Sequence, residues 1–178
     1  MLREGTAANH GALDARFAAL VDDADLHLYG AFLRMNAAAR AVLDPTVVRV
    51  IPAYRDSDFA DLHQGLQRDI KALGLSPMAP PALPPLRCDV PEAAGVLYVL
   101  DGSRLGARFL LPRLLQQFQG DVPLQYLKHA ASPHVTFQAL ERLAPSLDPA
   151  DVQRTVHAAR AAFDVFDRAA QSAIGDNA

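Results

Sequence analysis

Apolar side chains recur at steps of three and four along most of this chain of 178 residues, which is the spacing of amphipathic helices. The N-terminal stretch LREGTAANHGALD begins such a stripe and predicts a helix over residues 3–20. The members of the stripe are Leu2, Thr6, His10, Leu13, Phe17 and Leu20. Because Thr6 and His10 are polar, they are either tolerated in a core or face a group that binds an imidazole.

The same periodicity continues through the rest of the chain. It predicts further helices over residues 25–43, from a cap at 56–58 to Gly74, from Pro91 to residue 118, over 133–143 and over 149–173. The one strand-like stretch, TVVRVI at 46–51, fits a helix equally well. The chain is therefore predicted to be all-α, a compact fold of about six or seven helices.

Prolines are expected to interrupt this pattern. Asp44-Pro45 should end the second helix, and Pro112 should kink or end the helix that starts at Pro91, because proline lacks the N–H of a helix interior. Residues 76–92, SPMAPPALPPLRCDVPE, contain six prolines and favour extended chain. This stretch either divides two domains or connects helices within one. Since neither half has a complete core of its own, we expect a single domain over residues 1–178.

Composition excludes several classes of function. The net charge of −3 is spread along the chain without a basic block, which argues against nucleic-acid or membrane-surface binding. No apolar run approaches the roughly 20 residues of a membrane span, and the N-terminus lacks a secretion signal. Cys88 is the only cysteine, so internal disulfides and thiolate metal clusters are excluded. We expect a reduced, cytoplasmic setting.

Two glycines interrupt the apolar stretch YVLDGSRLGARF. Gly102 and Gly106 lie one turn apart, and each costs about 1 kcal/mol relative to alanine inside a helix. Two glycines on one face indicate that something approaches the helix closely. That something is either another helix backbone, which spacing alone favours, or a flat ligand bordered by Ser103. With a histidine on the N-terminal helix, a planar macrocycle with a central metal becomes a candidate, and imidazole commonly ligates haem iron.

Both stretches resemble motifs of a known family. LREGTAANHGALD resembles the N-terminal signature of haem oxygenases, and LYVLDGSRLGARF resembles the distal-helix signature of the bacterial, biliverdin-producing branch that is often linked to bacteriophytochromes. The resemblance implies a haem oxygenase-like fold with haem between two helices. It assigns residues to three groups: the iron ligand His10; the haem-contacting Arg3, Thr6 and Asp14; and the catalytic Gly102, Ser103 and Gly106.

The resemblance also implies an activity. In this family haem is both substrate and cofactor, and it is cleaved to biliverdin, iron and carbon monoxide. Electrons come from an external reductase or ferredoxin, which agrees with the lack of a flavin, NAD or iron–sulfur motif in this chain. The biliverdin would serve as a chromophore.

Several positions depart from the family pattern. Asp101 replaces a glutamate, Ala107 replaces a glycine and is expected to crowd the distal side, and Ala39 or Arg40 falls where relatives carry a glutamate. His129 and His134 fall near an expected tyrosine and tryptophan. These departures favour an alternative: a non-catalytic regulator of the same fold that binds a sensor kinase or phytochrome, with or without haem. Arg104 and Arg108 flank the glycines and reach either haem propionates or solvent. Whether the chain is an enzyme stays open on sequence alone.

Overall fold

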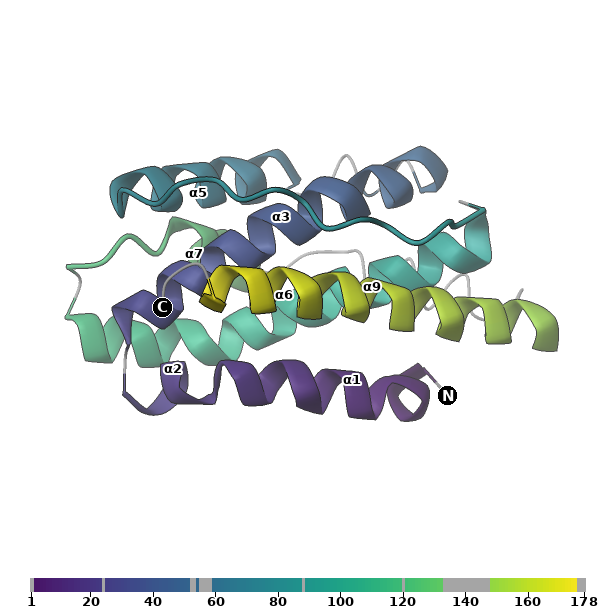
Figure 1. Ribbon diagram of the computed structural model, residues 1–178, viewed down its shortest axis with the longest axis horizontal. Helices are drawn as coiled ribbons and strands as arrows, with labels where there is room; N and C mark the ends of the chain where they lie inside the picture. Colours follow the sequence, from purple (N-terminus) through teal and green to yellow (C-terminus); the bar gives the residue numbers. More distant parts are fainter. Residues whose placement is uncertain are drawn as a thin grey trace.

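The computed structural model describes residues 2–23, 25–51, 54, 59–87, 89–119, 121–132 and 148–175. The regular structure in these ranges is helical (Figure 1), as the sequence predicted. The helices are α1 (Leu2–Arg16), α2 (Ala18–Asp22), α3 (Leu26–Val50), α5 (Phe59–Ala72), α6 (Val90–Phe118), α7 (Gln125–Ala131) and α9 (Pro149–Gly175). None of the described helices is both long and apolar enough to cross a membrane.

The central packing unit is formed by α3, α6 and α9. Their buried faces build one apolar cluster in which alanines of α9 allow close helix approach. Contact is tightest between α6 and α9, where a Cβ at Gly95 would collide with the Thr155 carbonyl oxygen and lie 2.9 Å from the Ala159 nitrogen. Glycine is therefore required at position 95 by the crossing of two helices.

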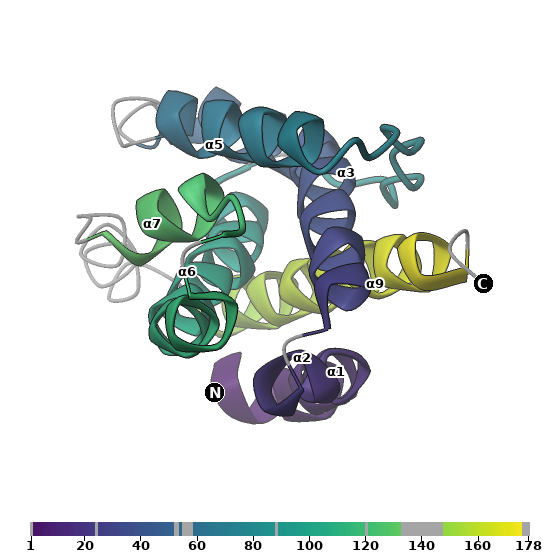
Figure 2. The same ribbon diagram turned by 90° about the vertical axis from the view of Figure 1, so that its left-hand side faces the viewer.

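The remaining helices pack around this unit. Figure 2 shows the α1–α2 pair and α6 at neighbouring corners of the molecule, with α5 and α7 on the far side from α1. A second apolar cluster joins α3, α5, α6 and α7, and includes Tyr29, Leu66, Leu114 and Tyr126. The two clusters share partly buried Phe32 at their border, so the described helices enclose a continuous core.

Two of the expected helix boundaries are wrong. The helix expected over 3–20 divides at Phe17, whose N–H bonds the Asp14 carbonyl three residues back and whose ring packs edge-on against Phe32. The helix α3 does not end at Asp44-Pro45. The helix α6 spans nearly the expected range and continues past Pro112, where we expected either a kink or an end. Both prolines are exposed, whereas their helices bury residues on the opposite face. Burial of those faces outweighs the hydrogen bond that each proline removes.

The proline-rich connection is extended, as expected. It follows Gly74, whose positive φ of 66° ends α5, and it shows no regular structure over residues 75–87. Arg168 of α9 donates to the Ala82 carbonyl at 2.7 Å, and Met78 packs on the core. The cap expected at 56–58, the helix expected at 133–143 and Cys88 lie outside the described residues.

A carboxylate of α5 caps the short helix α7. No side chain caps α7 locally, but Asp69 accepts the N–H groups of Gln125 at 3.1 Å and Tyr126 at 2.8 Å. Burial raises the pKa of the Asp69 carboxyl, and these two backbone bonds oppose that shift. One turn earlier, a Cβ at Gly65 would lie 3.0 Å from the backbone of Tyr126. The two features together fix α7 against α5.

We predict that Asp69→Ala lowers the free energy of unfolding by about 2–4 kcal/mol, because two backbone N–H groups lose their acceptor. Urea denaturation followed by circular dichroism measures the change. The matched control is Gln64→Ala on the exposed face of α5, which should change stability by less than about 0.5 kcal/mol. Equal effects of the two variants would show that the cap contributes nothing.

Candidate functional site

His10 is accessible to solvent, and a contact with Asp14 orients its imidazole ring. The side chain is 58% exposed, and Nδ1 lies 2.9 Å from Asp14 Oδ2 one turn on. The ring meets Phe163 of α9 edge-on, with the centroids 5.9 Å apart. Because the Asp14 carboxylate favours the proton on Nδ1, Nε2 keeps its lone pair for a ligand. The alternative that His10 is a buried core residue is therefore wrong.

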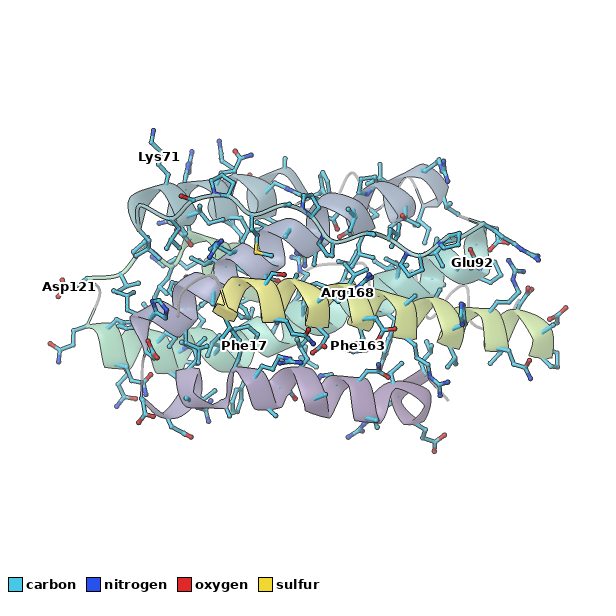
Figure 3. The ribbon with its side chains drawn as sticks, in the orientation of Figure 1. Phe17, Lys71, Glu92, Asp121, Phe163 and Arg168 are labelled. Carbon is cyan, nitrogen blue, oxygen red and sulfur yellow. The ribbon has the colours of Figure 1, made fainter. Side chains whose placement is uncertain are left out.

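Polar contacts hold α1 along α9. Arg16 pairs with Asp167 at 2.5 Å, and Arg160 donates to the Gly5 carbonyl at 2.7 Å. Figure 3 shows Phe163 in the layer between α9 and α1. These contacts lie on both sides of His10 in sequence, so they fix the rotation of α1 and the direction of the imidazole.

The other expected site residues of α1 differ in their exposure to solvent. Thr6 is 2% exposed and its hydroxyl donates to the Leu2 carbonyl at 2.8 Å, so it is satisfied within its own helix. Arg3 is exposed. Only Arg3, His10 and Asp14 of the expected haem-contacting set are therefore presented to solvent.

The glycine face of α6 is open. A Cβ at Gly102 or Gly106 would meet no described atom within 4 Å. Leu105 and Phe109 lie on the same face and are 66% and 56% exposed. Among the described residues, no helix packs against this face, so the described part of the chain does not show the helix packing expected at these glycines. The face thus presents two exposed apolar side chains, and the Arg113 guanidinium lies 3.5 Å from the centroid of the Phe109 ring.

Ser103 borders this face and is held from behind by a buried arginine. Arg40 of α3 is 0% exposed and donates to Ser103 Oγ at 2.9 Å and to the Leu100 carbonyl at 3.3 Å. The Ser103 hydroxyl itself donates to the Leu100 carbonyl at 2.6 Å. Arg40 thus joins α3 to the backbone of α6 beside Gly102.

The arginine belongs to a larger buried cluster. Asp44 Oδ1 lies 3.4 Å from Arg40 Nη1 and accepts the Tyr54 hydroxyl at 2.8 Å, and Asp44 Oδ2 lies 2.8 Å from His63 Nε2. Burial opposes the charge of Arg40, but Tyr126, Asp44 and Tyr54 around it raise its pKa well above the ordinary value. The guanidinium is therefore a permanent cation inside the core.

Sequence reasoning missed this cluster. Its local signal is an arginine on the buried stripe of RMNAAARAVL with an aspartate four residues later, a spacing that allows an ion pair within one helix. The partners on α6 and at residue 54 are far apart in sequence, so no local pattern indicates them.

Other expectations about α6 are corrected by burial. Ala107 is 1% exposed and packs in the second apolar cluster, so its methyl group does not crowd the open glycine face. Arg104 is 1% exposed and does not reach solvent. Arg108 donates to the carbonyl groups of Ala131 and Ser132 at 3.2 Å. Asp101 is buried, His129 lies in α7, and His134 lies outside the described residues.

The two helices that carry the candidate site both pack on α9. Both α1 and α6 pack against α9, and Gln117 near the end of α6 donates to the carbonyl groups of Val21 and Asp22 at 3.1 and 3.2 Å. Within the described ranges no hydrogen bond or ring contact joins His10 to α6. The candidate site therefore consists of an imidazole on α1 and a glycine face on α6, two helices that both pack on α9.

We predict that Gly102→Ala and Gly106→Ala each raise the free energy of unfolding of the ligand-free protein by up to about 1 kcal/mol, because the new methyl meets open space and alanine favours the helix. Gly95→Ala is the matched control and should destabilise by about 3 kcal/mol through its collision with α9. Thermal and urea denaturation measure all three. A loss of stability in the first two variants would mean that these glycines serve helix packing.

Comparison with known proteins gives a structural likeness. No family model and no curated protein sequence matches the chain. A haem oxygenase from Neisseria meningitidis, solved in NO- and CO-bound forms, superposes with a TM-score of 0.67 and 23% identity over 98% of this chain and 90% of that chain. At this identity the likeness concerns the fold, and it shows that the chain has an all-α, haem oxygenase-like fold.

Proposed function

We propose that the chain binds haem between α1 and the glycine face of α6 and cleaves it oxidatively to biliverdin, iron and carbon monoxide. The observation that carries the proposal is the pairing of an accessible imidazole on α1 with an uncovered, apolar glycine face on α6. The imidazole keeps a large exposed area although its ring also contacts Asp14 and Phe163, and the two glycines contact no described helix. The proposal also agrees with the fold of the similar haem oxygenase.

The residues of α1 fit the requirements of a haem-iron ligand. His10 presents Nε2 while Asp14 holds Nδ1 at 2.9 Å, an arrangement that fixes the tautomer and strengthens the imidazole as a donor. The exposed Gly11 next to it has no described atom within 4 Å of a Cβ position, so a flat group meets little obstruction beside the ligand. Arg3, exposed two turns earlier, supplies a cation for a haem propionate.

The residues of α6 fit the opposite face of the same group. Leu105 and Phe109 offer apolar contact, and the missing side chains of Gly102 and Gly106 allow a ring to approach the helix backbone. Ser103 supplies a polar group at the edge of this apolar surface. When bound, haem supplies the redox chemistry, with electrons from an external reductase or ferredoxin. The chain's own part is to orient the ring, exclude water from its face and hold a hydrogen-bonding group at Ser103.

A second candidate function uses the same face. The high exposure of Leu105 and Phe109 also suits a protein partner, so the chain would be a regulator that binds a sensor kinase or phytochrome. The two functions differ in what covers α6. Haem should cover it in the first, and an apolar surface of another protein in the second.

We predict saturable, one-to-one binding when haem is titrated into the purified protein, with a Soret band typical of histidine ligation. Addition of ascorbate should then convert the spectrum to that of a bilin. Binding without conversion would contradict the enzymatic part of the proposal. Failure to bind haem would contradict the proposal as a whole and favour the regulator.

We predict that His10→Ala abolishes the histidine-ligated spectrum without loss of helical circular dichroism, because the exposed imidazole contributes little to the core. The matched control is His157→Ala, which removes an exposed histidine of α9. If His10→Ala gives the same haem spectrum as the unaltered protein, another residue is the ligand.

We predict that Gly106→Leu blocks haem binding, or weakens it at least tenfold, because the new side chain occupies the space above α6. The apoprotein should stay folded, since that space is open. Unaltered haem affinity, measured by the same titration, would remove the glycine face from the site.

A further inference from the structure

The hydrogen bonds around Ser103 determine which way its hydroxyl points. A serine hydroxyl has one proton to donate and two lone pairs to accept with. The Arg40 guanidinium has donors only, so its contact of 2.9 Å takes up one lone pair of Ser103 Oγ. The Leu100 carbonyl is an acceptor only, so the contact of 2.6 Å takes up the proton. One lone pair is all that Ser103 has left for any further partner.

Arg40 is well suited to impose this arrangement. It is fully buried, it remains charged, and Asp44 and Tyr54 surround its Nη1 atom at 3.4 Å each. Its Nη2 atom bridges Ser103 Oγ and the Leu100 carbonyl. A hydrogen bond from a buried charged donor is among the stronger ones in proteins, so the Ser103 side chain is held in the rotamer that faces Arg40.

We propose that Arg40 is a positioning residue, which holds Ser103 so that the edge of the α6 face beside Gly102 and Gly106 offers a hydrogen-bond acceptor and no donor. This inference rests on the proposed function for the identity of the ligand, which is haem. It extends that function to the small molecules or ions, such as water or an anion, that would bind to the haem iron on the side facing α6. A water molecule there donates one proton to Ser103 and keeps the other for a second partner, whereas an anion that only accepts hydrogen bonds gains nothing from Ser103.

Fluoride is the probe for this inference, because it binds ferric haem and accepts hydrogen bonds without donating any. In the haem-loaded protein, Ser103→Ala should leave the fluoride dissociation constant within about twofold, since the hydroxyl does not donate to the ligand. Arg40→Lys preserves a positive charge for Asp44 but removes the Nη2 contacts that hold Ser103 Oγ beside the Leu100 carbonyl. The Ser103 side chain is then free to leave that carbonyl, turn to another rotamer and donate its proton to the ligand. Fluoride affinity should rise about three- to tenfold, the effect of one hydrogen bond.

The double variant and a matched control separate this effect from general loosening of the core. Arg40→Lys combined with Ser103→Ala should lose the gain in fluoride affinity. Tyr54→Phe removes the hydrogen bonds of the Tyr54 hydroxyl with Asp44 and with Arg40 Nη1, but it leaves the Arg40 Nη2 contacts with α6 in place. This variant should leave fluoride affinity unchanged. A threefold or larger loss in Ser103→Ala overturns the inference. It is also overturned if Arg40→Lys gives no gain, or gives the same gain with and without Ser103.

A measurement on the haem-free protein tests the contact itself. The unfolding equilibrium constants of the single and double variants in urea should show coupling between Arg40 and Ser103 of about three- to tenfold. Absence of coupling overturns the inference whether or not haem binds. If coupling is present but haem does not bind, the proposed function fails and the role toward a haem ligand fails with it.

Discussion

The close crossing of α6 over α9 at Gly95 is the constraint on which the rest of the molecule depends. A side chain at this position would collide with the Thr155 carbonyl, so the two backbones meet directly. The crossing fixes where α6 lies relative to α9, and α1 lies along the same helix α9 through Phe163 and Asp167. The distance between His10 and the glycine face therefore depends on one helix that both elements share.

The glycines of α6 serve two different purposes. Gly95 is buried at a helix crossing, where its lack of a side chain is a requirement of packing. Gly102 and Gly106 lie further along the same helix, where no described atom would contact a Cβ. Each of them lowers helix stability relative to alanine, and no packing contact with the described residues offsets this loss. Together with exposed Leu105 and Phe109, these glycines form the face that we propose as a binding surface.

The sequence predicted the helical class and most helices because apolar residues at steps of three and four are a direct consequence of burying one helix face. It failed at Pro45, since proline signals a break locally while the burial of the opposite face acts over the whole helix. The sequence indicates His10 and the glycine pair as candidate site residues because each lies in a short contiguous motif. It does not indicate the buried contacts of Arg40, because the partners Ser103 and Tyr54 come from distant parts of the chain. Thr6 is buried whereas His10 is exposed, although both lie on the same stripe of α1. This difference depends on how α1 is rotated on α9, which periodicity alone does not specify.

The central claim is that α1 supplies the iron ligand and α6 supplies the opposite wall of one haem site. The most direct measurement is a crystal structure of the haem-loaded protein. The account predicts iron bonded to His10 Nε2, Asp14 still bonded to Nδ1, and the ring lying over Gly102 and Gly106. Iron bonded to another residue, or haem on a different surface with the glycine face uncovered, would contradict it.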